Sequence, residues 1–153
     1  MTAKHLLVVA HTPSDNLKRL KDALTSGATG LSSINIRCVT PLDSGPADLA
    51  DCAAVVLLTP ENLGYMAGAM KDWFDRIYYP VLESHQGLPV VAIIRAGHDG
   101  TGTRRALDTI TTGLRWRWVQ EPLILRGNWR DEWCEEIQAL GEAVATALDS
   151  GIF

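Results

Sequence analysis

Five short runs of apolar residues, rich in β-branched side chains, are spaced along the chain. Each run is apolar almost throughout instead of alternating with polar residues, which is typical of strands that helices cover on both faces. The sequence therefore predicts five strands of a parallel sheet, at Leu6–Ala10, Ile34–Val39, Ala53–Leu58, Leu88–Ile94 and Pro122–Leu125.

Between the predicted strands lie segments whose apolar residues are three and four positions apart, as in helices with one buried face. The first helix is expected to begin near Asp15, with Ser14 as its cap. Pro80 is expected to end the second, because proline lacks the N–H that a helix needs. The expected helices run from about Asp15 to Gly27, Met66 to Tyr79, Thr103 to Thr112 and Trp133 to Leu148, and the link Pro41–Asp51 has only a short helical candidate.

Strands that alternate with helices indicate right-handed βαβ units. We therefore expect a single α/β domain over residues 1–153, a three-layer sandwich around a five-stranded parallel sheet, for which we take the strand order 2-1-3-4-5. Ligands of such sheets bind beyond the carboxyl ends of the strands, where the strand order reverses. Function is therefore expected in the loops that follow the first, third and fourth strands.

Composition and charge narrow the classes of function. The chain carries 14 Lys and Arg against 18 Asp and Glu, a net charge of −4, which argues against nucleic-acid binding by bulk charge. Its apolar runs are far shorter than the roughly 20 residues of a membrane-spanning helix. The first residues show no leader pattern, so a cytoplasmic protein is expected. Three widely spaced cysteines predict neither a disulfide framework nor a metal site.

The loop after the first predicted strand is short, rich in hydroxyl groups and free of Lys and Arg. Its sequence is His11-Thr12-Pro13-Ser14-Asp15-Asn16. Exposed N–H groups at the start of a helix, with the hydroxyls of Thr12 and Ser14 and the Asn16 amide, are suited to a phosphate group. The alternative is that Ser14 and Asp15 only cap the helix, and both readings stay open. Neither the nucleoside triphosphate motif nor the dinucleotide fingerprint is present.

Two further loops contain glycines. Pro60 and Gly64 bracket the loop after the third strand, where the backbone can approach a flat ligand closely. Gly68, expected inside the next helix, indicates either a ligand nearby or close packing of helix and sheet. The loop Arg95–Thr103 has three glycines in six residues. Three such loops after neighbouring strands favour one shared crevice.

These residues resemble the flavodoxin-like FMN-binding superfamily over essentially the whole chain. The segment Lys4–Asn16 is similar to that family's first strand and phosphate loop. Pro60–Asp75 is similar to the second flavin loop of NAD(P)H-dependent FMN reductases and of quinone reductases of the Trp-repressor-binding-protein type. The resemblance implies an FMN site made of His11, Thr12, Ser14, Asp15 and Asn16, of Pro60, Glu61, Asn62, Leu63 and Gly64, and of Ala96, Gly97, His98 and Gly100.

The resemblance implies an FMN oxidoreductase that takes electrons from NADH or NADPH and passes them to a quinone or another small acceptor, and it also leads us to expect a homodimer. The flavin carries such chemistry, so no side-chain acid or base is required, with His98 the candidate if there is one. The third loop has no Trp or Tyr to cover the flavin, which favours access for a nicotinamide or quinone.

The alternative is a flavodoxin-type single-electron carrier between proteins. Arg104 and Arg105 either meet a dinucleotide phosphate or lie on a solvated helix face.

Overall fold

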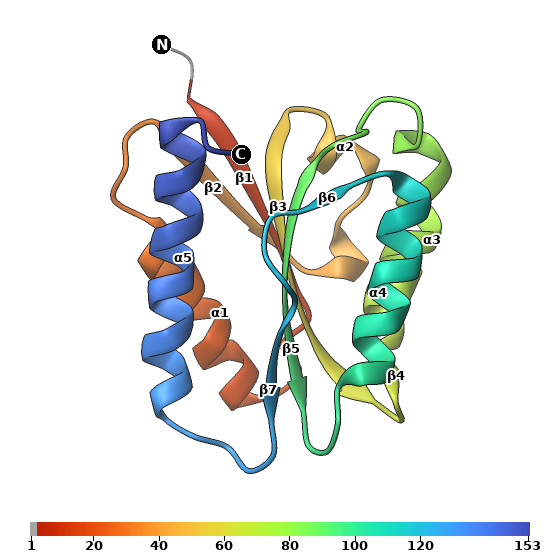
Figure 1. Cartoon of the computed structure of the whole chain (residues 1–153), viewed down its shortest axis with the longest axis vertical. Helices are drawn as coiled ribbons and strands as arrows, with labels where there is room; N and C mark the ends of the chain where they lie inside the picture. Colours follow the sequence, from red (N-terminus) through yellow and green to blue (C-terminus); the bar gives the residue numbers. More distant parts are fainter. Residues whose placement is uncertain (1–2) are drawn as a thin grey trace.

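The computed structural model describes residues 3–153, which form three layers around one parallel sheet (Figure 1). Strands β2, β1, β3 and β5 lie side by side in that order, and two short segments, β6 and β7, both pair with β5 at its far edge. Every pairing among these six strands is parallel. The strands are β1 (Lys4–Ala10), β2 (Ile34–Val39), β3 (Cys52–Asn62), β5 (Pro89–Ala96), β6 (Arg117–Trp118) and β7 (Leu123–Arg126).

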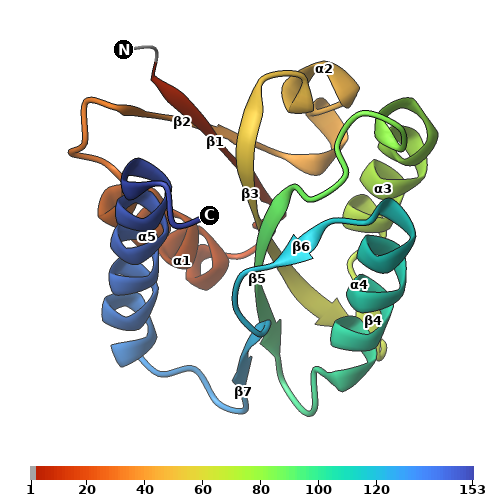
Figure 2. The same ribbon diagram turned by 45° about the horizontal axis from the view of Figure 1, so that its top comes forward.

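Helices cover both faces of the sheet. One face carries α1 (Asp15–Ala28) and α5 (Glu132–Ser150), and the other carries α3 (Gly68–Val81) and α4 (Thr101–Leu114), as Figure 2 shows. The crossover from β2 to β3 contains only a 3₁₀ turn, Pro41–Asp43, and the short helix α2 (Pro46–Leu49). No helix within residues 3–153 combines the length and the apolar character needed to cross a membrane.

Two apolar cores follow directly from the alternation of side chains along each strand. On β1, Leu6 and Val8 face the core beneath α1 and α5, where they join residues such as Leu20 and Ile137. Leu7, between them, faces the core beneath α3 and α4. Because both faces of the strand are buried, its sequence is continuously apolar, as predicted for a parallel sheet.

The predicted strand order is confirmed. When β5 is counted as the fourth strand and β6 with β7 as an interrupted fifth, the sheet has the order 2-1-3-4-5. Residues 119–122 break the fifth strand into its two parts. The apolar pattern did not predict this break, and it did not predict β4 (Tyr65–Met66), which pairs antiparallel with the end of β3.

The helix predictions held in position. Helices α4 and α5 extend one or two residues beyond both expected ends, and α3 differs at both of its boundaries. Ser14 is the cap of α1, as predicted, and its side chain accepts a hydrogen bond from the Leu17 N–H. Helix α3 begins at Gly68 instead of Met66, because Met66 belongs to the short strand β4. Pro80 does not end α3, which runs one residue further to Val81. The missing N–H of Pro80 thus falls in the last turn of the helix.

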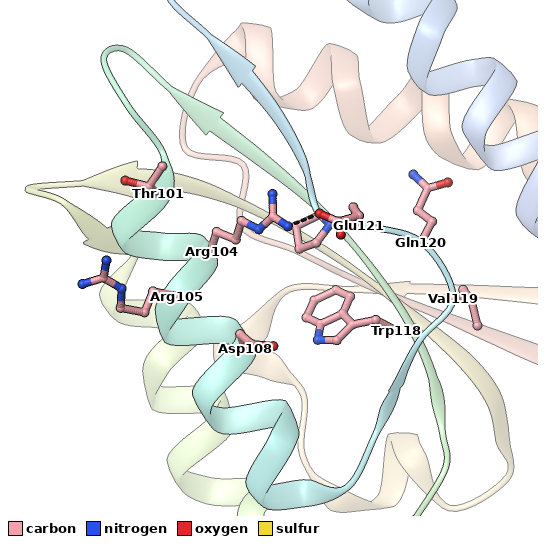
Figure 3. Close-up of a pocket in the computed structure, with 9 residues that line it drawn as sticks. Thr101, Arg104, Arg105, Asp108, Trp118, Val119, Gln120 and Glu121 are labelled. Carbon is pink, nitrogen blue, oxygen red and sulfur yellow. Dashed lines mark hydrogen bonds and ion pairs between the residues drawn. The ribbon is translucent and has the colours of Figure 1, made fainter.

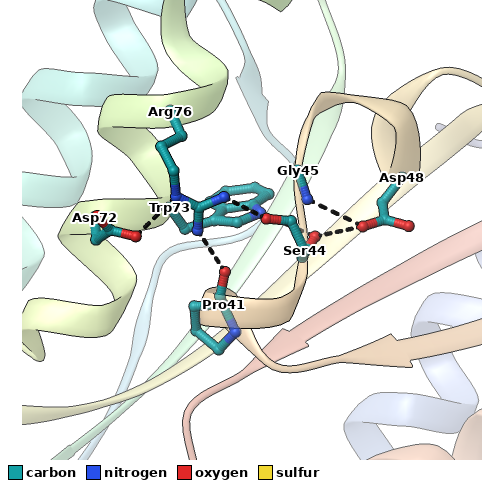
Figure 4. A network of polar contacts seen from close by, with 7 residues as sticks. All are labelled: Pro41, Ser44, Gly45, Asp48, Asp72, Trp73 and Arg76. Atoms are coloured by element: carbon teal, nitrogen blue, oxygen red, sulfur yellow. Dashed lines mark hydrogen bonds and ion pairs between the residues drawn. The ribbon is translucent and has the colours of Figure 1, made fainter.

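The β2–β3 crossover is held by a network of polar contacts (Figure 4). The Trp73 indole N–H of α3 donates to the Ser44 hydroxyl at 3.0 Å, and that hydroxyl donates to the Asp48 carboxylate at 2.7 Å. Asp48 also accepts from the Gly45 N–H at 3.1 Å. Arg76 donates to the backbone carbonyls of Ser44 and Pro41 at 2.6 and 2.7 Å. A stretch with little secondary structure is thereby fixed to α3.

Candidate functional site

The three loops singled out from the sequence lie at one edge of the sheet. The carboxyl ends of β1, β3 and β5 are neighbours, because β1 pairs with β3 and β3 pairs with β5 in parallel. The loops that leave them lead into α1, the β3–β4 hairpin and α4 at the lower end of the molecule in Figure 1. We refer to this part of the molecule as the carboxyl edge.

The first loop presents open hydrogen-bond donors. The Ser14 hydroxyl oxygen accepts from the Leu17 N–H at 3.2 Å and keeps its own O–H free to donate elsewhere. The N–H groups of Asp15 and Asn16, the first two residues of α1, have no acceptor among residues 3–153. The capping interpretation of Ser14 is therefore correct, and it leaves donors for a phosphate at the same helix end.

The side chains of the first loop differ in exposure. Those of Ser14, Asp15 and Asn16 are exposed, whereas His11 and Thr12 are partly buried. The His11 N–H donates to the Leu58 carbonyl at 2.9 Å, which ties the loop to β3. Burial lowers the pKa of the His11 imidazole from its usual 6.5, so the neutral form is favoured.

The second loop is a β-hairpin. Glu61 pairs with Met66 and Asn62 with Tyr65, and the two residues at the tip both have positive φ, 54° at Leu63 and 78° at Gly64. Positive φ at both central residues is the geometry of the tight hairpin turn, and it is unusual for leucine. The Leu63 side chain is fully exposed at this tip. Pro60 is buried, while Asn62 and Gly64 are exposed.

The carboxylate of Glu61 joins the second loop to the third. One oxygen accepts from the Gly100 N–H at 2.9 Å, and the other accepts from the Thr103 N–H at 3.1 Å and from the Thr103 hydroxyl at 2.9 Å. Burial raises the pKa of Glu61, but these hydrogen bonds from Thr103 and Gly100 outweigh it, so the pKa lies below 4.5. Glu61 is thus ionised at neutral pH and turned toward the start of α4.

The third loop is fixed from its other side by β7. The Arg126 side chain donates to the Asp99 carbonyl at 2.6 Å, and the Gly127 N–H donates to the Ala96 carbonyl at 2.9 Å. Ala96 and Gly100 are buried, whereas Gly97 and His98 are exposed at the tip. The roles of Thr103 and Arg126 were not predicted, because their contacts with the loops join residues distant in sequence.

Two glycines of the carboxyl edge have open space where a side chain would stand. A Cβ atom on Gly68 or on Gly97 would meet no protein atom within 4 Å. Close packing of helix and sheet, one of the two explanations considered for Gly68, is therefore wrong. Gly102 differs, because its Cβ would lie 1.9 Å from the Gly64 carbonyl oxygen. The start of α4 thus packs directly on the hairpin tip.

A groove of about 660 Å³ lies beside this edge and not within it (Figure 3). It runs between α4 and residues 118–122, where the fifth strand is broken. Figure 3 shows Arg104 reaching across it to form an ion pair with Glu121. Glu121 thus neutralises Arg104, whereas Arg105, which also lines the groove, forms no ion pair within residues 3–153. The Trp118 indole N–H donates to Thr111 of α4 at 3.0 Å, and Trp116 is buried, so both tryptophans pack within the fold.

The chain is similar in structure to several proteins of known fold. A flavodoxin from the domain Archaea has a TM-score of 0.79 and 17% identity, with 95% of this chain and 99% of that one covered. A WrbA-like flavodoxin from Agrobacterium tumefaciens has a TM-score of 0.72 and 15% identity, covering 97% and 99%. The two-electron reduced flavodoxin of Megasphaera elsdenii has a TM-score of 0.73 and 16% identity, covering 93% and 99%.

The same comparison finds the fold within larger proteins. The flavodiiron protein from Giardia intestinalis has a TM-score of 0.79 and 17% identity over 97% of this chain, but only 37% of that protein is covered. No protein-family model matches the chain, and no curated protein matches it in sequence. At these identities the likeness concerns architecture, and it agrees with the strand order described above. The chain therefore has a flavodoxin-like fold.

Proposed function

We propose that the protein binds FMN at the carboxyl edge and uses it to pass electrons from NADH or NADPH to a quinone or another small acceptor. The observation that carries the proposal is the start of α1, where the N–H groups of Asp15 and Asn16 are open and hydroxyl groups stand beside them. A helix amino end of this kind attracts a phosphate group even without Lys or Arg.

The residues of the edge fit the rest of the cofactor. Thr12, Ser14 and Asn16 supply neutral donors for the phosphate. The space beside Gly68 and Gly97 admits a flat ring close to the backbone, because neither residue presents a side chain there. The hairpin from Pro60 to Gly64 and the third loop from Ala96 to Gly100 would flank that ring.

The protein's part in the reaction is to bind and to orient. When bound, FMN supplies the hydride and electron transfer. Backbone N–H groups of the second and third loops would favour the negative charge that reduction places on the ring. His98, exposed at the tip of the third loop, is the one titratable side chain of that tip suited to giving a proton to an acceptor.

The proposal is tested by visible absorbance. Purified protein is mixed with FMN, desalted, and exposed without oxygen first to NADPH and then to NADH. We expect flavin absorbance to stay with the protein and to bleach on addition of at least one nucleotide. Protein that retains no flavin, and shows no binding in an FMN titration, would contradict the proposed cofactor.

A single-electron carrier is the second candidate, and one observation favours it. Leu63 is fully exposed and Tyr65 is 40% exposed, both on the hairpin beside the proposed flavin site. Apolar side chains on a protruding turn suit docking to another protein. Retained flavin that bleaches with dithionite but with neither nucleotide would support the carrier over the reductase. The predicted homodimer is tested separately by light scattering.

A further inference from the structure

The amino end of α4 is capped by a residue from another part of the chain. Helices are commonly capped by the side chain of the preceding residue, which accepts from the N–H of the second or third helical residue. Gly100 occupies that position in α4 and has no side chain. The Glu61 carboxylate takes its place by accepting from the N–H groups of Gly100 and Thr103.

The position of this carboxylate is fixed by more than its hydrogen bonds. Gly102 and Gly64 are packed so closely that a Cβ on Gly102 would lie 1.9 Å from the Gly64 carbonyl oxygen. Arg126 holds the third loop from the opposite side through the Asp99 carbonyl. The negative charge of Glu61 therefore stands at the positive end of the α4 dipole and is held there on both sides.

The first loop differs in the charge of its cap. At both helix ends the first two N–H groups, those of Thr101 and Gly102 in α4 and of Asp15 and Asn16 in α1, have no acceptor among residues 3–153. Ser14 caps α1 with a neutral hydroxyl, whereas the cap of α4 is the Glu61 carboxylate. Helices α1 and α4 are both 14 residues long and both begin at the carboxyl edge. Their amino ends would compete for the same anion if Glu61 were absent.

We propose that Glu61 is a positioning residue that acts as an internal anion. It occupies the amino end of α4, closes that end to phosphate, and fastens the second loop to the third, so that a phosphate-bearing ligand is directed to α1. The link to FMN rests on the proposed function, whereas the closure of α4 to phosphate does not. This role differs from the direct flavin contact that the resemblance implies for Glu61.

The test compares substitutions at Glu61 with a matched control. Glu61→Ala removes the internal anion. Glu61→Gln keeps the shape but turns an N–H₂ group toward donors, because only one of its two terminal atoms accepts. Glu121→Gln is the matched control. It removes the same charge from Glu121, which is exposed, pairs with Arg104 and has no role in the three loops. Amide chemical shifts of all four proteins are followed while inorganic phosphate is added.

The expected result is specific in position. In the wild type and in Glu121→Gln, phosphate should shift the amides of residues 15–17 and leave those of residues 100–103 unchanged. In Glu61→Ala, residues 100–103 should shift as well. Phosphate shifts at residues 100–103 in the wild type, or their absence in Glu61→Ala, would overturn the proposal.

A second measurement covers the case in which Glu61→Ala does not fold. Thr103→Val removes one donor to Glu61 with little change in volume. It is combined with Glu61→Gln in a double-mutant cycle, and hydrogen exchange is measured at residues 97–103. The effects of the two substitutions on exchange should be strongly non-additive. Additive effects would contradict the proposed fastening.

If the wild type binds FMN, Glu61→Gln should weaken binding at least tenfold and Glu121→Gln less than twofold. Absence of FMN binding in the wild type would count against the proposed function alone.

Discussion

The β2–β3 crossover and the first loop of the carboxyl edge both carry polar groups, yet they use these groups in opposite ways. In the crossover, the donors and acceptors of Ser44, Asp48 and Trp73 are joined to one another and to the backbone. At the edge, the first loop keeps the N–H groups of Asp15 and Asn16 and the Ser14 O–H open. The two regions therefore differ in how their polar groups are paired.

The difference separates residues that build the fold from residues that remain available to a ligand. A buried polar group costs free energy unless it is paired, so the crossover network is best explained by stability. Donors that are exposed and unpaired contribute little to stability, and they stay free to bind. Substitutions in the crossover should therefore lower stability without changing FMN binding, and substitutions at the unpaired positions of the edge should do the reverse.

The largest expected effect is that of Asp48→Ala in the crossover. The substitution leaves the Ser44 hydroxyl and the Gly45 N–H without their acceptor and breaks the 2.6 Å ion pair with Arg37. We expect the free energy of unfolding to fall by about 2–3 kcal/mol in urea titration, with FMN affinity unchanged. Asp72→Ala is the control, since its ion pair with Arg76 is half-exposed and its loss should cost about 0.5 kcal/mol. Equal losses in the two variants would contradict the special role of the network.

Two glycine substitutions sharpen the same comparison. A Cβ on Gly141 of α5 would lie 2.2 Å from the Leu24 carbonyl oxygen of α1, so Gly141→Ala should cost about 1–3 kcal/mol. A Cβ on Gly68 meets nothing, so Gly68→Ala should leave the free energy of unfolding within about 0.5 kcal/mol. Gly68→Ala should instead weaken FMN binding severalfold, measured by flavin fluorescence. An unchanged FMN affinity would remove Gly68 from the proposed site.

How much of the fold and of the candidate site the sequence predicts depends on how far apart in sequence the interacting residues lie. The positions of the strands and the Ser14 cap follow from local patterns, since apolar runs and a hydroxyl before a helix act over a few residues. The hairpin at Leu63 was missed because its first turn residue is leucine and not the usual Asn, Asp or Gly. The contact of Glu61 with Thr103 joins residues 42 positions apart, so no local sequence pattern predicts it.

A smaller effect is expected at Asp15, and it has the opposite sign. The Asp15 carboxylate is exposed in the first turn of α1, where it interacts favourably with the helix dipole but would repel a phosphate group. Asp15→Asn should therefore tighten FMN binding by about two- to fivefold, which corresponds to about 0.4–1 kcal/mol. Titrations at low and high salt provide the check, because the gain should shrink as salt screens the charge. Weaker binding would place the phosphate away from α1.

The smallest effect is a change in the protonation of His11. Burial holds the pKa of this imidazole below 6.5, so the unfolded chain binds a proton more readily than the folded one. As pH falls through 6.5, the contribution of His11 to stability therefore decreases.

A phosphate dianion bound at the first loop would favour the protonated imidazole and raise this pKa. Proton resonances of the ring, followed against pH with and without FMN, should show the midpoint moving toward higher pH. The resonances of His85, which is fixed to the Leu49 carbonyl in the crossover, should not move when FMN is added. An unchanged His11 midpoint would show that the phosphate does not bind near this ring, and the open donors of α1 would then need another ligand.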